Sequence, residues 1–453
     1  MGESGFDVAV IGGGVAGLSA ATALVEQGRK VIVLEARGEL GGRATAFVDR
    51  ETGELVDNGQ HVLFGCYHET FRFLRRIGAQ SHVSIQSSLT IPFIGPDGGR
   101  SIFRCPRLPS PFHLLAAVMT WNALPWHERL RALRLAPVLL RARSRSDPGS
   151  TRFATSASDE TVAEWLTRYG QIGRIRNWLW DPLAVAALNQ SPDEAGANAF
   201  VGVLGGLFGP DRNDSALVLP ARPLNEMYAT PARDYIQARN GTVRLHALSR
   251  VRIEHGAVRG VEIRGEQVDV GQVIAAVPWF ALEPLLTGDV VPLAPILQAA
   301  SAMTSKPIVT VNLWYDRPVM DDTFVGLPGR AMQWVFDKRQ SFGESASHLS
   351  LVSSGADALV ANDNSSLIAL AAREVADAIP GARAATLLHG AVVREKRATF
   401  SLAHGEPPRP GVRTPVTGLF LAGDWIDTGL PGTIESAALA GHRAAATVIG
   451  RNE

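Results

Sequence analysis

Three glycines near the start of the chain have the spacing that suits a pyrophosphate. Gly12, Gly14 and Gly17 form a G-x-G-x-x-G pattern, and Glu35 follows about 20 residues later. The first glycine permits a tight turn, the second lets the backbone approach the phosphates, and the third lets a helix pack closely on a strand. The carboxylate of Glu35 can accept hydrogen bonds from a ribose. Together these residues predict a dinucleotide-binding site.

The elements that would position these residues lie on either side of them. The apolar run Val8–Ile11 is typical of a strand buried on both faces of a parallel sheet. A helix over residues 15–27, with Ala16 in its first turn, would point its free N–H groups at the pyrophosphate. A second apolar strand then ends at Glu35. This order of strand, glycine turn, helix and strand predicts an α/β fold with a Rossmann-type domain.

The bulk composition bounds the class of protein. A chain of 453 residues is too long for one compact core, so we expect at least two domains. The 44 basic and 44 acidic residues balance, which argues against nucleic acid as a partner. Cys66 and Cys105 lack the spacing of a metal site, so no metal is expected. With no visible signal peptide and no uncharged stretch of about 20 apolar residues, we expect a cytoplasmic protein without a spanning helix.

A second glycine pair and an arginine indicate which kind of dinucleotide the site would bind. Ala36 and Arg37 lead to a glycine pair that ends at Gly42, and Arg43 follows. Glycines let the backbone pass close to a ligand, and the planar guanidinium of Arg43 can reach a pyrophosphate. A nicotinamide-binding domain would normally continue with another helix and strand. The pattern resembles the FAD-binding start of the flavin amine oxidase and carotenoid desaturase superfamily, whose members are GR2-like flavoproteins.

That resemblance assigns roles to residues further along the chain. In the superfamily the segment matching residues 56–65 runs under the isoalloxazine ring, which implies that Gly59, Gln60 and His61 lie beside the flavin. The alternative for His61 is a buried histidine with its hydrogen bonds satisfied. Backbone near Val251 lies beside the adenine in superfamily members.

The C-terminal region completes the expected FAD site. An apolar strand ends at Gly423 and Asp424, and a helix rich in small residues opens near Thr433 and Ile434. A strand and helix start of this kind can cap a phosphate or a flavin edge with free N–H groups. The resemblance implies that Asp424 bonds a ribityl hydroxyl. On its own, such an aspartate would be only a helix cap.

The order of segments predicts a cofactor domain interrupted by a substrate domain of mixed α+β structure. We expect the FAD-binding domain in three parts and the substrate domain in two. In chain order they are an FAD-binding part (1–105), a mainly helical insertion facing substrate or membrane (106–222), an FAD-binding part (223–290), the sheet part of the substrate domain (291–410) and the C-terminal FAD-binding part (411–453).

The helical insertion carries a basic amphipathic stretch over residues 112–145, broken near Pro125. Leu130, Leu133, Ala136 and Leu140 share a face at helical spacing. Arginines follow the rest of the stretch at positions 129, 131, 134, 141, 143 and 145. An apolar face with a basic rim suits an interfacial helix on anionic lipid, and a core-packed helix with a solvated basic side gives the same pattern. We expect peripheral attachment to the inner face of the cytoplasmic membrane.

Two segments narrow the resemblance. Residues 57–67 (DNGQHVLFGCY) and a tryptophan-rich helix ending at residues 187–189, taken with the two FAD motifs, resemble the hydroxysqualene dehydroxylases of bacterial hopanoid pathways. The resemblance implies that the enzyme reduces the allylic alcohol hydroxysqualene to squalene. Hydride comes from reduced flavin, an acid protonates the departing hydroxyl, and the electron donor is not identified. A long hydrocarbon substrate would need an apolar tunnel.

Three side chains are candidates for the acid. His61 is placed beside the flavin by resemblance. Asp181 follows Trp178 and Trp180 in the apolar helix, and such surroundings raise a carboxyl pKa. Asp57 is the third candidate, although it could serve only to fix the backbone under the flavin.

Other functions on the same fold stay open. A carotenoid-type desaturase would use oxidised flavin to remove hydride, and a flavin amine oxidase would need an aromatic cage that the sequence does not reveal. A prenyl-binding chaperone would use the fold without flavin chemistry, but the presence of Glu35, Arg43 and Asp424 argues against it.

Overall fold

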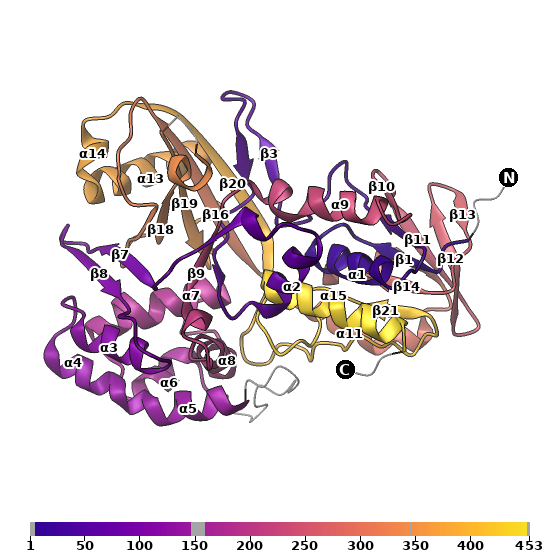
Figure 1. The fold of residues 1–453 in the computed structure, drawn as a ribbon, viewed down its shortest axis with the longest axis horizontal. Coiled ribbons are helices and arrows are strands. Elements are labelled where there is room, and N and C mark those ends of the chain that lie inside the picture. Colours follow the sequence, from indigo (N-terminus) through magenta and orange to yellow (C-terminus); the bar gives the residue numbers. More distant parts are fainter. Residues whose placement is uncertain (1–4, 146–158, 344–346, 451–453) are drawn as a thin grey trace.

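A five-stranded parallel sheet forms the centre of the nucleotide-binding part, at the right of Figure 1. The computed structural model describes residues 5–145, 159–343 and 347–450. In spatial order the strands are β10 (Thr242–Arg244), β2 (Val31–Leu34), β1 (Val8–Ile11), β14 (Val273–Ala275) and β21 (Leu419–Leu421). The sheet therefore joins strands that come from three distant parts of the chain.

Alternate residues of β1 and β2 face two different layers. Val8, Val10 and their neighbours pack against α1 (Val15–Glu26), α9 (Thr230–Gln237) and α15 (Ile434–Val448). Ala9 and Ile11 pack instead against a smaller sheet and its helices. That layer contains β13 (Glu266–Val268), β12 (Ala257–Ile263), β11 (Ser249–Glu254), β15 (Leu286–Gly288), α10 (Leu282–Leu285) and α11 (Ala294–Ala302). Burial on both faces explains why the strands are continuously apolar.

The turn between β1 and α1 has the close packing that the glycine spacing predicts. A Cβ atom on Gly17 would lie 1.9 Å from the carbonyl oxygen of Gly12, so only glycine fits there. A Cβ atom on Gly441 of α15 would lie 2.2 Å from the carbonyl oxygen of Ala16. The small residues of the last helix therefore let it pack directly on α1.

A seven-stranded sheet forms the framework of the second part, at the upper left of Figure 1. In spatial order it contains β20 (Leu387–Phe400), β16 (Ser305–Tyr315), β19 (Ser347–Ser354), β18 (Trp334–Asp337), β17 (Phe324–Gly326), β7 (Thr90–Ile94) and β8 (Arg100–Arg104). The predicted boundary at residue 105 groups β7 and β8 with the FAD-binding part. In the structure β7 pairs with β17 and with β8, so this hairpin is part of the large sheet.

The two faces of the large sheet have different partners. Val325, Val335 and Leu351 pack against α13 (Asn364–Ala378) and α14 (Pro380–Arg383). Phe324 and Phe336, on the other face, point toward the helical part of the chain. Helices α3 (Phe112–Thr120), α4 (Trp126–Ala132), α5 (Ala136–Arg145), α6 (Val162–Arg168), α7 (Asp181–Leu188) and α8 (Ala197–Leu207) form that part, at the lower left of Figure 1.

Short elements connect these layers. They are the hairpin β3 (Ala46–Val48) and β4 (Leu55–Asp57), helix α2 (His68–Arg76), helix α12 (Lys338–Phe342), and a small sheet of β5 (Leu63–Phe64), β9 (Leu217–Pro220) and β6 (Val83–Ile85). The loop between β4 and β5 passes from the nucleotide-binding part to the helical part. Within the described ranges, no helix is both long enough and apolar enough to cross a membrane.

Candidate active site

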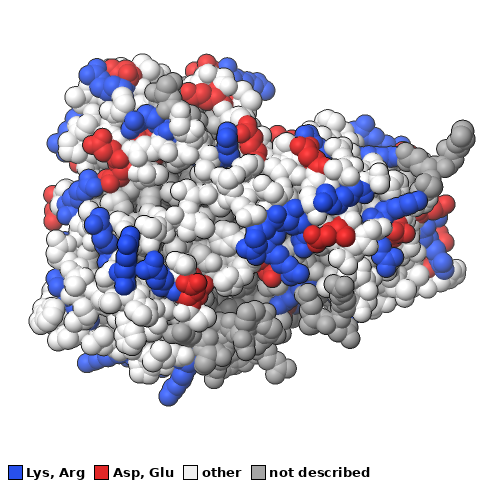
Figure 2. Space-filling view, viewed as in Figure 1, with Lys and Arg blue, Asp and Glu red and all other residues white. Residues whose placement is uncertain are grey.

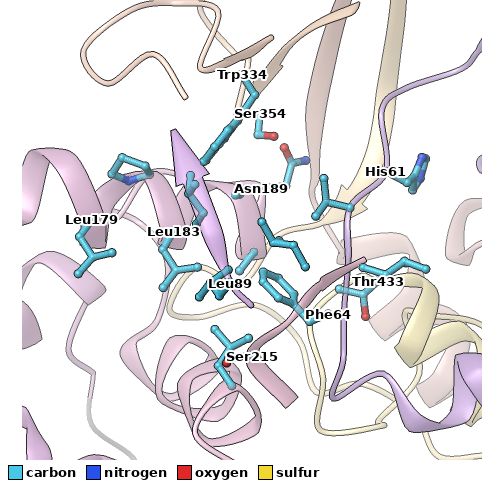
Figure 3. A pocket seen from close by; sticks show the side chains of 18 of the residues that line it. His61, Phe64, Leu89, Leu179, Leu183, Asn189, Ser215, Trp334, Ser354 and Thr433 are labelled. Carbon is cyan, nitrogen blue, oxygen red and sulfur yellow. The ribbon is translucent and has the colours of Figure 1, made fainter. Parts of the chain in front are cut away.

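A cavity of about 330 Å³ lies between the large sheet and the helical part. Most of its lining is apolar, and Figure 3 shows Leu179 and Leu183 at one side of it. The tryptophan-rich helix therefore contributes to the lining of the cavity. Asn189 ends α7 and ties it to the sheet, since its amide group bonds Lys306 O, Thr399 Oγ1 and Gly355 N.

Polar side chains gather at the side of the cavity that faces the nucleotide-binding part. They come from the segment before β3, from the loop after β4, from β20 and from the start of α15, and Figure 3 shows His61 and Thr433 on this side. The polar residues here are Arg43, Asn58, Gln60, His61, Glu395, Thr399 and Thr433. The cavity therefore combines an apolar chamber with one polar end, the usual form of a small-molecule site.

A buried ion pair holds the loop at this polar end. Lys338 Nζ lies 2.8 Å from Asp57 Oδ2 and 2.8 Å from Gln60 Oε1, and its side chain is 1% exposed. The second carboxylate oxygen of Asp57 accepts a hydrogen bond from Leu224 N at 3.0 Å. Asp57 is thus occupied by fixing the loop, the second of the two roles that the sequence left open for it.

His61 lines the cavity as a neutral imidazole. Its Nδ1 lies 2.8 Å from the carbonyl oxygen of Gly59, and a carbonyl only accepts, so Nδ1 carries the proton. Burial lowers the pKa of His61 below its usual value. At neutral pH its Nε2 is therefore an acceptor, which suits His61 to orienting a hydroxyl better than to protonating one.

Asp181 lies outside the cavity lining, although Trp180 and Pro182 on either side of it are part of that lining. Burial raises the pKa of Asp181, the direction that its apolar surroundings predict, while Arg176 opposes the shift. Arg176 Nε lies 3.1 and 3.2 Å from the two carboxylate oxygens. The structure does not bring Asp181 together with His61 and Gln60.

The N-terminus of α1 fits a pyrophosphate. Gly14 is the N-cap residue of α1 and makes no side-chain capping hydrogen bond, so the first N–H groups of the helix remain available to a ligand. A Cβ atom on Gly42 would lie 3.3 Å from Gly14 Cα, so the two glycine segments form a narrow backbone cradle. Glu35 lies next to it, where its carboxylate accepts hydrogen bonds from Gly13 N at 2.7 Å and from Arg37 N at 2.8 Å. Free lone pairs on the same oxygens can accept ribose hydroxyls.

Arg43 and Asp424 bind each other in this structure. Their side chains form an ion pair, and Arg43 also donates to the carbonyl oxygen of Ala398 at 2.8 Å. The sequence assigned Arg43 to the pyrophosphate and Asp424 to the ribityl chain. Gly423, with a φ of +144°, lets β21 turn so that Asp424 reaches this position.

The remaining predicted residues lie in different parts of the molecule. Thr433 caps α15 by accepting from Ser436 N, and Thr433 and Ile434 both line the cavity. Ala36 and Arg37 are exposed. Val251 is fully buried within β11, and its carbonyl oxygen accepts a hydrogen bond from Thr287.

Sequence reasoning missed Lys338 and Glu395. Lys338 follows an apolar strand and Glu395 lies in the charged run Arg394–Arg397, so both look like solvated surface charges. A weak signal for Lys338 is the preceding Asp337, which caps the short helix α12 by accepting a hydrogen bond from Arg339 N.

Comparison with known proteins identifies the family. Residues 15–449 match the family model described as flavin containing amine oxidoreductase. The chain belongs to this family. It is an FAD-dependent oxidoreductase, and the residues around α1 are those that would hold the dinucleotide.

Two kinds of curated relative match almost the whole chain. The hydroxysqualene dehydroxylase of Sinorhizobium fredii is 30% identical over 97% of this chain and 97% of its own length. A 15-cis-phytoene desaturase of Narcissus pseudonarcissus is 26% identical over 99% of this chain and 80% of its own length. The 15-cis-phytoene desaturase of Synechococcus elongatus is 25% identical over 98% of this chain and 96% of its own length.

Solved structures share the fold. A putrescine oxidase variant superimposes with a TM-score of 0.73 at 18% identity, covering 99% of both chains. An oxidoreductase from Methanosarcina mazei superimposes with a TM-score of 0.72 at 19% identity, covering 96% of this chain and 99% of the oxidoreductase chain. These likenesses confirm the expected α/β flavoprotein fold.

We predict that Glu35→Ala weakens FAD binding. A hydrogen bond to a charged group contributes about 1.5–3 kcal/mol, so the dissociation constant should rise by roughly ten- to a hundredfold. The measurement is FAD titration of the apoprotein, followed by flavin absorbance. Glu39→Ala, an exposed neighbour, is the control. Equal affinities of Glu35→Ala and wild type would exclude the assignment.

Replacing Lys338 with methionine should destabilise the protein, because it leaves the charge of the buried Asp57 carboxylate without an opposite charge. Breaking a buried pair costs about 3–5 kcal/mol. Urea unfolding measures the loss, and Lys396→Met on the exposed part of β20 is the control. The double variant Asp57→Asn, Lys338→Met should recover part of the loss. A Lys338→Met protein as stable as wild type would contradict the importance of this pair.

Proposed function

We propose that the protein reduces hydroxysqualene to squalene with loss of water. The main support is the hydroxysqualene dehydroxylase relative, which is 30% identical across nearly the full length of both chains. The apolar cavity with one polar end suits a hydrocarbon that carries a single hydroxyl. The phytoene desaturase relatives favour a second candidate, a desaturase that removes hydride from an isoprenoid chain.

Residues in different parts of the cavity would have different roles in the reaction. Reduced FAD, when bound, supplies hydride to the carbon that loses its oxygen. Leu179, Leu183 and their apolar neighbours would hold the hydrocarbon and exclude water, which protects an allylic cation from capture by water. His61 Nε2 would accept a hydrogen bond from the substrate hydroxyl and so orient it.

The proposed reaction can be tested directly. Protein reduced with dithionite under anaerobic conditions should convert hydroxysqualene to squalene, detected by lipid extraction and mass spectrometry. Oxidised protein is the control and should give no squalene. A different result would favour the desaturase: no squalene from reduced protein, but desaturation of phytoene by oxidised protein.

We also propose that the helical part binds an anionic membrane next to the cavity. Leu130 and Leu140 of the apolar face predicted from the sequence are 48% and 52% exposed, and the nearby Phe112 and Trp126 are 60% and 62% exposed. Leu133 on the same face is 42% exposed and also lines the cavity. Figure 2 shows this lower-left corner as mostly uncharged surface with a few basic side chains. A lipid-soluble substrate could then enter without crossing water.

The basic rim is smaller than the sequence indicates. Arg134 and Arg141 are exposed, and Arg131 is half-buried. Arg129 instead donates to the carbonyl oxygens of Leu124 and Met119. The side chains of Arg143 and Arg145 lie outside the described residues.

Phe112→Glu should reduce binding to anionic vesicles by about tenfold or more, because burial of such a side chain contributes about 1.5–3 kcal/mol. Flotation with vesicles of phosphatidylglycerol measures binding, and added salt should weaken it. Val291→Glu is a matched control, since Val291 is 77% exposed but lies outside the helical part. Equal flotation of both variants, or no flotation of wild type, would contradict attachment through this face.

A further inference from the structure

One carboxylic acid lines the cavity among the residues that the structure describes. This residue is Glu395, on the edge strand β20. It pairs in register with Ile308 of β16, which also lines the cavity. Nothing in the sequence pattern distinguishes Glu395 from the exposed Lys396 and Arg397 that follow it.

Contacts fix the Glu395 carboxyl group at the polar end of the cavity. Its Oε2 lies 3.4 Å from Asn58 Nδ2, and its Oε1 lies 3.3 Å from Arg397 N. The same Asn58 amide donates to the carbonyl oxygen of Arg43 at 3.0 Å. Glu395 is therefore held against the loop that carries Gly59, Gln60 and His61.

The other acids considered for the reaction are occupied or elsewhere. Asp57 is paired with Lys338, and Asp181 is paired with Arg176 outside the cavity. The half-buried imidazole of His61 has a lowered pKa, and its Nδ1–H is donated to Gly59 O. Of these groups, only Glu395 combines a carboxyl group with a place in the lining.

We propose that Glu395 is a catalytic residue that protonates the departing hydroxyl of the substrate. This role rests on the proposed reduction of an allylic alcohol. The carbon–oxygen bond breaks with its electron pair going to oxygen, and that oxygen takes the proton of Glu395 and leaves as water. The carbon gains a hydride from reduced flavin, so the substrate is reduced by two electrons and the flavin is oxidised. Solvent later returns a proton to Glu395.

An apolar substrate would assist this step. By filling the cavity it excludes bulk water from the reacting atoms, so the departing hydroxyl takes its proton from the carboxyl group rather than from solvent. His61 Nε2 and Glu395 would contact the same hydroxyl in complementary roles, one accepting and one donating.

The first experiment compares Glu395→Gln with Lys396→Gln, a control at the next, exposed position. Both are reduced with dithionite and mixed with hydroxysqualene in a single turnover. We expect the rate to fall on the order of 10²–10⁴ in Glu395→Gln and to stay near wild type in Lys396→Gln. Glu395→Asp should retain more activity than Glu395→Gln. A wild-type rate in Glu395→Gln would overturn the proposal.

A substrate with a better leaving group separates proton donation from a structural role. In the acetate ester of hydroxysqualene the leaving group is the acetate ion, which departs without being protonated. Wild type and Glu395→Gln should therefore convert this ester to squalene at equal rates. Equal loss with both substrates in Glu395→Gln would mean a structural role and would overturn the proposal. If wild type makes no squalene from either substrate, the proposed function itself fails.

A binding measurement gives a readout that does not depend on turnover. A long-chain tertiary amine, charged at neutral pH and apolar on both sides, mimics the cation that forms when the hydroxyl departs. It should bind wild type at least tenfold more tightly than Glu395→Gln, measured by tryptophan fluorescence, while squalene binds both equally. Equal affinity of the amine for both proteins would place Glu395 away from the reacting carbon.

Discussion

The candidate active site depends on one buried cation. Lys338 comes from the second part of the molecule, yet its ammonium group holds Asp57 and Gln60 of the loop that enters from the nucleotide-binding part. The ring of Phe342 lies 4.0 Å from the same nitrogen and helps to shield it from water. Desolvating a charged lysine is costly, and these contacts offset the cost only if all of them are made together. The loop at the polar end of the cavity is therefore held in one arrangement.

Local patterns were sufficient to predict the nucleotide-binding part. The glycine turn, the helix after it and the position of Glu35 follow from backbone requirements within a few residues, so the sequence predicts them well. The C-terminal strand and helix could be placed for the same reason. The division into domains was harder, because the hairpin β7–β8 has strand propensity alone and nothing local says which sheet it joins.

The polar end of the cavity could not be predicted from local patterns. Lys338 and Asp57 are 281 residues apart, and Asn58 and Glu395 are 337 apart, so only the folded chain brings them together. Asp181 illustrates the opposite difficulty. Its apolar neighbours correctly indicate a raised carboxyl pKa, but helical geometry turns it away from the cavity that Trp180 and Pro182 line.

The two faces of the large sheet have different roles. On one face it packs against α13, and this core leaves the sheet little freedom to move. On the other face it is the fixed wall of the cavity, whose opposite wall is made by helices between residues 112 and 208. The length and branching of the molecule that fits are therefore set mainly by the helices, while most polar residues of the lining come from the loop after β4 and from β20. Substitutions in the helices can thus change the size and shape of the molecule that the cavity accepts while its polar end stays the same.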